Sequence, residues 1–248
     1  GSICGNEVMH KETGRVFRML PEQSLAENWK GRYSDLNKMT DLELAELQLS
    51  KSDWHSRRAR IILQARASKR QIDQDALKKL QDIFNRNSNA DYRLRGMWSL
   101  HITGGFTEDD LIKSLKDRDE YVRAWAVQMI AEDKNPSDKA LNKFLSMAKK
   151  DRSAVVRMYI AAAFQRIDEE KRWPIAEALM GNEKDNDDHN IPKFIWFAFE
   201  PLVTSDPVRA IEFAKKSKIN LVSEYIARRL VDADELDVLA SGIQSRSS

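Results

Sequence analysis

The chain has 248 residues, of which 42% are hydrophobic and 32% are charged. Its single cysteine excludes an internal disulfide, a four-cysteine zinc site and a CxxCH haem attachment. The 41 basic and 39 acidic residues leave a net charge of only +2, which disfavours a role in nucleic-acid binding. No apolar run approaches the length of about 18 residues that a transmembrane helix needs.

The N-terminal residues differ from the rest of the chain. Gly1-Ser2 is typical of a remnant left by cloning. Thr13-Gly14 predicts a turn, and the run from Val16 to Leu20 predicts a short strand. We therefore expect a non-helical, strand-like piece over 1–20 and a helical domain over 21–248.

Short helices with clear start signals follow. Thr40 and Glu43 form a capping box that predicts a helix over 41–50. An apolar stripe that ends at Phe84 predicts a helix over 74–84. Further start signals are Thr107, Ser137, Trp173-Pro174 (for 174–180, ended by Gly181) and Asp206-Pro207 (for 207–217).

Between these helices lies a second set with a repeating apolar pattern. Apolar residues recur at positions 0, +3, +4, +7 and +8, the spacing of an amphipathic helix. The copies start at Leu94, Val122, Val156, Pro192 and Val222, with a weaker copy near Arg58 that includes Ile61, Ile62 and Ala65. Trp98, Trp125 and Trp196 occupy stripe positions, so we expect them in the core.

Alternation of the two sets predicts a run of helical hairpins. No single hairpin can bury its apolar stripe, whereas stacked hairpins share a continuous core. The predicted fold class is all-α: an α-solenoid of helical hairpins, preceded by the short strand-like N-terminal piece.

The residue after the first stripe position is basic in four consecutive copies: Arg95, Arg123, Arg157 and Lys193. Such a row could bind an anionic partner along one surface. Alternatively, each side chain pairs with acidic groups of its own or the neighbouring repeat, and Asp91 and Asp119 lie one turn away. Ion pairing within the stack is the favoured interpretation. We expect Asp91, Asp119 and Ser153 to cap these helices.

The most concentrated polar cluster contains Asp185, Asp187, Asp188 and His189, and Asn190 follows it directly. It lacks the glycine and the distal glutamate of an EF-hand loop, so a solvated loop is favoured over a metal site. Because it leads into a helix expected to end at Glu200, it is also a candidate edge for contact with another domain. The four histidines (His10, His55, His101 and His189) show no zinc spacing, and no catalytic or phosphate-binding motif is present.

The DxxxVR element at the start of the second helices, as in DRDEYVR at 117–123, resembles the HEAT repeat over about 40–240. Longer phrases resemble the HEAT segment of the large multidomain membrane-bound dehydrogenases of planctomycete type. They are SDWH at 52–55, RRAR at 57–60, WSLHITGG at 98–105, VRAWAVQ at 122–128, RWPIA at 172–176, DDHN at 187–190, and the run from Trp196 to Leu202.

In that family a sugar-dehydrogenase-like β-propeller precedes the HEAT array and a c-type cytochrome domain follows it. The resemblance implies that 1–20 contains the end of the propeller and that the protein is periplasmic or otherwise extracytoplasmic. It implies no cofactor in this chain, since the haem and the dehydrogenase cofactor would belong to the neighbouring domains. The expected function is a non-catalytic scaffold that links or positions those domains, with them or another protein as partner. The alternatives are a DNA-interacting protein of the alkylpurine glycosylase type, supported by Arg95, Arg123, Arg157, Trp98 and Trp125, and a general protein-binding solenoid.

Overall fold

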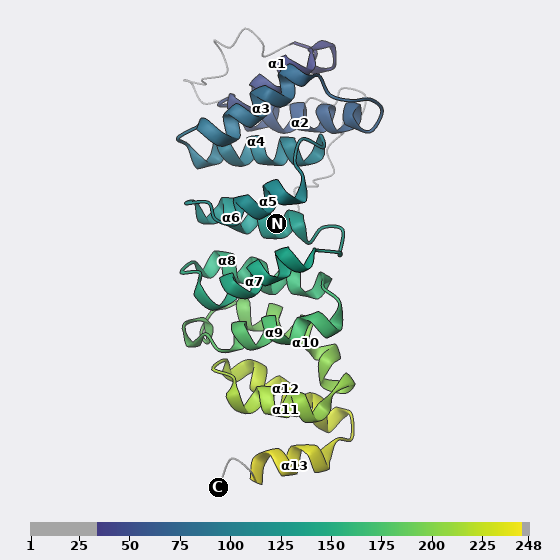
Figure 1. The fold of residues 1–248 in the computed structure, drawn as a ribbon, viewed down its shortest axis with the longest axis vertical. Coiled ribbons are helices and arrows are strands. Elements are labelled where there is room, and N and C mark those ends of the chain that lie inside the picture. The colour runs from purple at the N-terminus through teal and green to yellow at the C-terminus, as the bar shows by residue number, and fades with distance from the viewer. Residues whose placement is uncertain (1–33, 245–248) are drawn as a thin grey trace, which may run out of the picture.

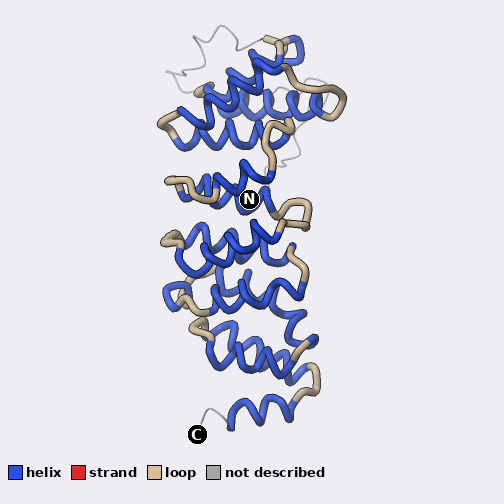
Figure 2. The backbone as a smooth tube through the Cα atoms, viewed as in Figure 1, coloured by secondary structure: helices blue, strands red, loops and turns tan. Residues whose placement is uncertain are grey.

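Helix follows helix through residues 34–244, the part of the chain that the computed structural model describes (Figure 1). These residues contain helices and loops but no strand (Figure 2). The α-helices are α1 (Asp41–Glu46), α2 (Asp53–Ala67), α3 (Gln74–Arg86), α4 (Ala90–Ile102), α5 (Glu108–Ser114), α6 (Glu120–Ile130), α7 (Asp138–Lys150), α8 (Ala154–Ala163), α9 (Glu169–Met180), α10 (Ile191–Ser205), α11 (Pro207–Lys216), α12 (Asn220–Asp232) and α13 (Leu236–Gln244).

The helices form antiparallel hairpins that stack in two layers. One layer holds the first helix of each hairpin, from α1 to α11, and the other holds the second helices, from α2 to α12 (Figure 1). Second helices pack on second helices, as α6 does on α8 and α8 on α10, and α13 packs against both α11 and α12. The predicted α-solenoid is confirmed for the described residues. The expected strand at 16–20 lies outside them.

Most of the predicted helix starts are confirmed because the cap residues bind the free amides of the first turn. Thr40 accepts from the Glu43 amide while the Glu43 carboxylate accepts from the Thr40 amide, which completes the capping box. Ser137, Ser153 and Asp206 likewise accept from backbone amides two or three residues ahead. Gly181 ends α9 as predicted.

Several predicted boundaries are wrong, and two involve proline. α9 begins at Glu169, so Pro174 lies inside the helix and does not open it. Two acidic residues in the first turn, which favour a helix N-terminus, supply the earlier start. α10 continues through Pro201 to Ser205, so Glu200 does not end it. The first helix, expected over 41–50, gives way to a 3-10 turn after Glu46.

One expected cap and one expected core residue also differ. Asn89 caps α4, so Asp91 lies inside the helix, and Asp119 caps α6 as predicted. In α2 the buried face carries Ala59, Ile62 and Leu63, whereas Ile61, expected on the apolar stripe, is exposed.

The core runs unbroken between the two layers. It includes fully buried side chains from both: Leu44, Leu63, Leu80, Met97, Leu100, Phe144, Phe164, Ile160, Ile175, Leu179 and Phe199. Each hairpin contributes part of this core and none encloses its own, which is why the hairpins stay together.

The hairpins α3/α4 and α5/α6 pack less closely on each other than the other neighbouring hairpins do. There α3 and α5 make little direct contact, and a hollow of about 370 Å³ lies between them. Its lining includes Phe84 from α3 and Phe106 from the loop before α5, whose rings meet edge to face at 5.2 Å. Within residues 34–244, no helix has the length and apolar character needed to cross a membrane.

Candidate interaction surface

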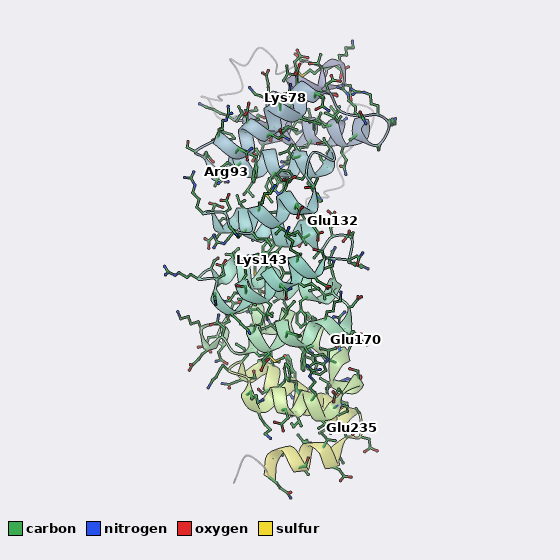
Figure 3. All side chains as sticks on the ribbon, in the orientation of Figure 1. Lys78, Arg93, Glu132, Lys143, Glu170 and Glu235 are labelled. Carbon is green, nitrogen blue, oxygen red and sulfur yellow. The ribbon has the colours of Figure 1, made fainter. Side chains whose placement is uncertain are left out.

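A chain of arginine–aspartate pairs joins four successive hairpins. Arg93 of α4 binds Asp117, Arg123 of α6 binds Asp151, and Arg157 of α8 binds Asp185. The three aspartates follow one another at intervals of 34 residues, and they lie in the segments that precede α6, α8 and α10. Arg93 lies at the edge of the stack where α3/α4 faces α5/α6 (Figure 3).

Each of these pairs is bidentate. Arg123 donates to both carboxylate oxygens of Asp151 at 2.8 and 2.9 Å, and Arg157 donates to those of Asp185 at 2.6 and 2.5 Å. The same arginines also bind a backbone carbonyl of their own hairpin: Arg123 that of Asp117, and Arg157 that of Asp151. Each arginine is therefore held in place by its own hairpin and, in turn, fixes the loop that carries the aspartate of the next hairpin.

These contacts shift the pKa values of several of the groups involved. The hydrogen bonds that Arg123 donates to Asp151 raise the pKa of Arg123, and those that Arg157 donates to Asp185 raise the pKa of Arg157. Burial pushes the pKa of Asp117 and Asp151 upward, but hydrogen bonds from Arg93 and Arg123 outweigh it, so both carboxyls have a pKa below the usual value. The Arg93–Asp117 and Arg123–Asp151 pairs therefore remain ionised at neutral pH.

The favoured interpretation of the basic row, ion pairing within the stack, agrees with this geometry for three of its four members. The partners belong to a neighbouring repeat, one of the two expected sources, and are not Asp91 or Asp119: Arg123 and Arg157 bind carboxylates of the following repeat. In α4 the equivalent residue is Arg93 and not Arg95, because Asn89 starts the helix two residues earlier than expected. Arg95 instead reaches back to the Ser50 carbonyl at 2.7 Å and to Asp53.

The fourth member of the row, Lys193, lies outside the chain of pairs. It is half-buried in the first turn of α10, and within the described residues no salt bridge to it is found. The pairs therefore end at Asp185. The arginines that would bind phosphates in a DNA-interacting protein, Arg95, Arg123 and Arg157, are already occupied by protein acceptors.

Aromatic side chains of neighbouring second helices meet in a row. Trp98 of α4 contacts Trp125 of α6 at 5.1 Å between ring centroids, and Trp125 lies 6.2 Å from Tyr159 of α8. All three are half-buried and packed against the core, so the expectation that Trp98 and Trp125 lie inside it is only partly correct. Tyr121, one turn before Trp125, is 50% exposed. We call Trp98, Tyr121, Trp125 and Tyr159 the aromatic row.

A similar pair occurs further along the stack. Trp196 of α10 and Tyr225 of α12 lie 5.3 Å apart, and the neighbouring Phe197 is 55% exposed. Trp196 too is half-buried instead of core. Beside this pair, Glu200 lies 3.7 Å from the Nε of Arg229, a long and partly exposed contact.

Arg60 of α2 covers the aromatic row at the end where Trp98 lies. Its guanidinium carbon lies 4.8 Å above the Trp98 ring, within the range of a cation–π contact. Burial, reinforced by the positive charges of Arg95 and Arg57, lowers the pKa of Arg60 to about 10. Arg60 Nη1 and Trp98 Nε1 are buried without a hydrogen-bond partner.

The loop before α10 joins hairpins instead of forming a metal site. Asp185 is bound by Arg157, and Asp188 accepts from the amides of Asn190 and Ile191 at the start of α10. Asp188 therefore caps this helix start. Asp187, His189 and Asn190 are exposed. Among residues 34–244, no group of three or more His, Cys, Asp and Glu side chains could hold a metal ion.

The family comparison decides the nature of the central repeats. Residues 108–189, from the start of α5 into the loop before α10, match the model of HEAT repeats. The chain contains a HEAT-repeat segment. No curated protein and no solved structure matched the chain. The Arg–Asp pairs from Arg123 to Asp185 lie inside the HEAT segment, and the pair formed by Arg93 extends the same arrangement one hairpin further towards the N-terminus.

Two features of this surface were not predicted. The aspartates of the pairs carry a readable signal: Asp117 and Asp151 each precede an arginine by six residues and recur after 34. The exposure of the aromatic row has a weaker signal, since Trp98, Trp125 and Tyr159 occupy the same positions as core residues. How much of each ring stays in solvent depends on how closely the neighbouring helices pack beside it.

Proposed function

We propose that the chain is a non-catalytic HEAT-repeat scaffold that binds another protein or a neighbouring domain through the aromatic row. The row itself carries the proposal, because it joins three successive second helices with ring contacts of 5.1 and 6.2 Å and leaves its members partly open to solvent. Aromatic side chains offer a large contact area and few rotatable bonds, and they are enriched at protein interfaces.

The Arg–Asp pairs supply the rigidity that such a surface needs. They tie the starts of α4, α6 and α8 to the loop of the next hairpin, so the aromatic side chains on those helices hold a fixed spacing. A preformed surface loses little conformational freedom on binding.

A finer proposal rests on the sequence resemblance. We propose that the segment links or positions the dehydrogenase and cytochrome domains of a larger extracytoplasmic redox protein, with the cofactors held by those domains. The exposed loop of Asp187, His189 and Asn190, together with Asp188, Lys193 and Glu200, would then form an edge for contact with one domain. Sequencing the gene on both sides tests this: a propeller upstream and CxxCH downstream support it, and other domains contradict it.

Binding of the separately produced neighbouring domain, measured by titration calorimetry, tests the scaffold proposal. Tyr121→Ala removes an exposed ring at little cost to folding, and we expect it to weaken binding about tenfold, the loss typical of a central interface residue. Lys149→Ala, an exposed change on α7 in the other layer, is the matched control and should bind like the wild type. Equal affinities for the wild type and Tyr121→Ala would contradict the proposal.

A further inference from the structure

Arg60 differs from the other arginines that are partly buried in the second helices. Arg93, Arg123 and Arg157 each bind two oxygens of one carboxylate, whereas Arg60 has a buried Nη1 with no hydrogen-bond partner. The indole Nε1 beneath it, on Trp98, is likewise unpaired. Leaving such donors unsatisfied is costly, and the described residues supply no acceptor for them. Arg60 as a whole is only half-buried, so its guanidinium can turn towards an acceptor that arrives at the surface.

The charges around Arg60 indicate that the missing hydrogen-bond acceptor is negatively charged. Arg57 lies one turn earlier on the same helix and is exposed, and Arg95 approaches from α4. Asp53 is the nearby carboxylate, and it is bound by Arg95. Three guanidinium groups therefore share one carboxylate, which leaves a local excess of positive charge at the end of an aromatic surface.

We propose that Arg60, together with Arg57, receives a carboxylate from the polypeptide that binds the aromatic row, with apolar side chains of the same polypeptide lying on Trp98, Trp125 and Tyr159. This inference rests on the proposed scaffold function and names the chemistry of its partner: an extended segment with an acidic residue at the end that lies on α2.

The spacing of the helices predicts the spacing of the partner's side chains. Packed helices lie about 8–10 Å apart, and a segment in the extended polyproline II conformation advances about 3.1 Å per residue with three residues per turn, so every third side chain points the same way. One contact on each of α2, α4, α6 and α8 therefore corresponds to every third residue. The expected pattern is an acidic residue followed by apolar residues at about +3, +6 and +9.

A polypeptide carboxylate fits this surface better than a nucleic-acid phosphate. Successive phosphates would need free cations beside α6 and α8, but Arg123 and Arg157 are held there by aspartates. The rings of Trp98 and Trp125 meet edge to face, at 72°, instead of standing apart to accept a base between them.

Selection from a phage library of random twelve-residue peptides, followed by fluorescence anisotropy with end-capped synthetic peptides, tests the inference. We expect the acidic-then-apolar pattern to be enriched, and replacing the acidic residue by its amide to weaken binding to the wild type about tenfold, as for loss of a hydrogen bond to a charged group. In Arg60→Met, which keeps the apolar stem over Trp98, the preference for the acidic peptide should shrink because only Arg57 remains to bind the carboxylate. Arg86→Met, an exposed change on α3, should keep the tenfold preference.

The folded state of each variant is checked by its melting temperature, and Arg60→Met should melt at or above the wild-type temperature because it removes a desolvated cation. A tenfold preference retained in Arg60→Met would overturn the inference, as would selected peptides without an acidic residue, or a single-stranded oligonucleotide that displaces the peptide from Arg60. Selected peptides that bind Tyr121→Ala as tightly as the wild type would instead contradict the scaffold function. If no peptide sequence were enriched, both the inferred acidic segment and the proposed scaffold function would be contradicted.

Discussion

The ion pair between Arg157 and Asp185 is the most deeply buried link between hairpins, with side chains 5% and 2% exposed. Asp185→Asn leaves the Arg157 charge buried without its carboxylate, so we expect the free energy of unfolding to fall by about 3–5 kcal/mol. Urea denaturation followed by circular dichroism measures it.

Asp187→Asn is the matched control for this change. Asp187 lies in the same loop but is exposed, and among residues 34–244 its carboxylate accepts a hydrogen bond from the neighbouring Asn186 side chain only. Its substitution should change the free energy of unfolding by less than about 0.5 kcal/mol. Similar losses in the free energy of unfolding of the two variants would show that the Arg157–Asp185 pair does not stabilise the fold.

The aspartates of the earlier pairs predict how stability depends on pH. Although burial opposes it, hydrogen bonds from Arg93 and Arg123 lower the pKa of Asp117 and Asp151 in the folded protein. Their contribution is therefore complete above the unfolded pKa of about 3.9 and is lost as the pH falls towards the lower folded value. Urea denaturation between pH 7 and pH 3 should show this loss below about pH 4.5. Asp151→Asn should show a smaller loss over the same range, and an unchanged pH dependence would contradict the assignment.

At the scale of an element, α3 and α4 approach each other at a glycine. A Cβ on Gly96 would lie 3.1 Å from both the Leu80 carbonyl oxygen and the Phe84 amide nitrogen, which are backbone atoms of α3 and cannot turn aside. The higher helix propensity of alanine is worth at most about 1 kcal/mol. We expect Gly96→Ala to lower the free energy of unfolding by about 1–3 kcal/mol because the hairpin is overpacked. An increase in thermal or urea stability would show that the two helices separate easily.

We expect the helix α5 to be the least stable helix inside the stack. It has seven residues, makes little contact with α3, and borders the 370 Å³ hollow. Local opening is cheapest where few contacts are broken. Hydrogen exchange followed by mass spectrometry should therefore show faster exchange in α5 than in α7, which is thirteen residues long and packs against both α8 and α9. Slower exchange in α5 would mean that the step between α3 and α5 is as firm as the others.

The sequence predicted the hairpins well because caps and apolar stripes are local signals. Thr40, Ser137 and Asp206 bind amides two or three residues ahead, so their role is visible without the fold. Contacts between repeats were predicted less well. Arg123 lies nearer to Asp119 in sequence, yet it binds Asp151, which the stacking of α6 on α8 brings to it.

Exposure on the second helices was harder still. Trp125 and Ala126 are adjacent stripe residues, and one is half-buried while the other is fully buried. The helical period places both on the inner side within its width of about 100°. Which of them reaches solvent depends on how closely α4 and α8 flank α6, and no single helix encodes that distance.

At the scale of the whole molecule, the described part of the chain is a two-layer stack in which the second helices carry both the links between repeats and the proposed binding surface. The Arg–Asp pairs lie near the starts of these helices and fix the distance between repeats, while Trp98, Trp125 and Tyr159 lie further along the same helices. A partner that spans several hairpins can use this regular spacing, since each step presents one ring at a set interval.

Hydrogen exchange of the chain with and without its bound partner, the neighbouring domain or a selected peptide, tests this account most directly. The account predicts slower exchange on binding in 92–98, 121–128 and 155–162, the middle parts of α4, α6 and α8, with little change in α3, α5 and α7. Protection confined to the first-helix layer would contradict it.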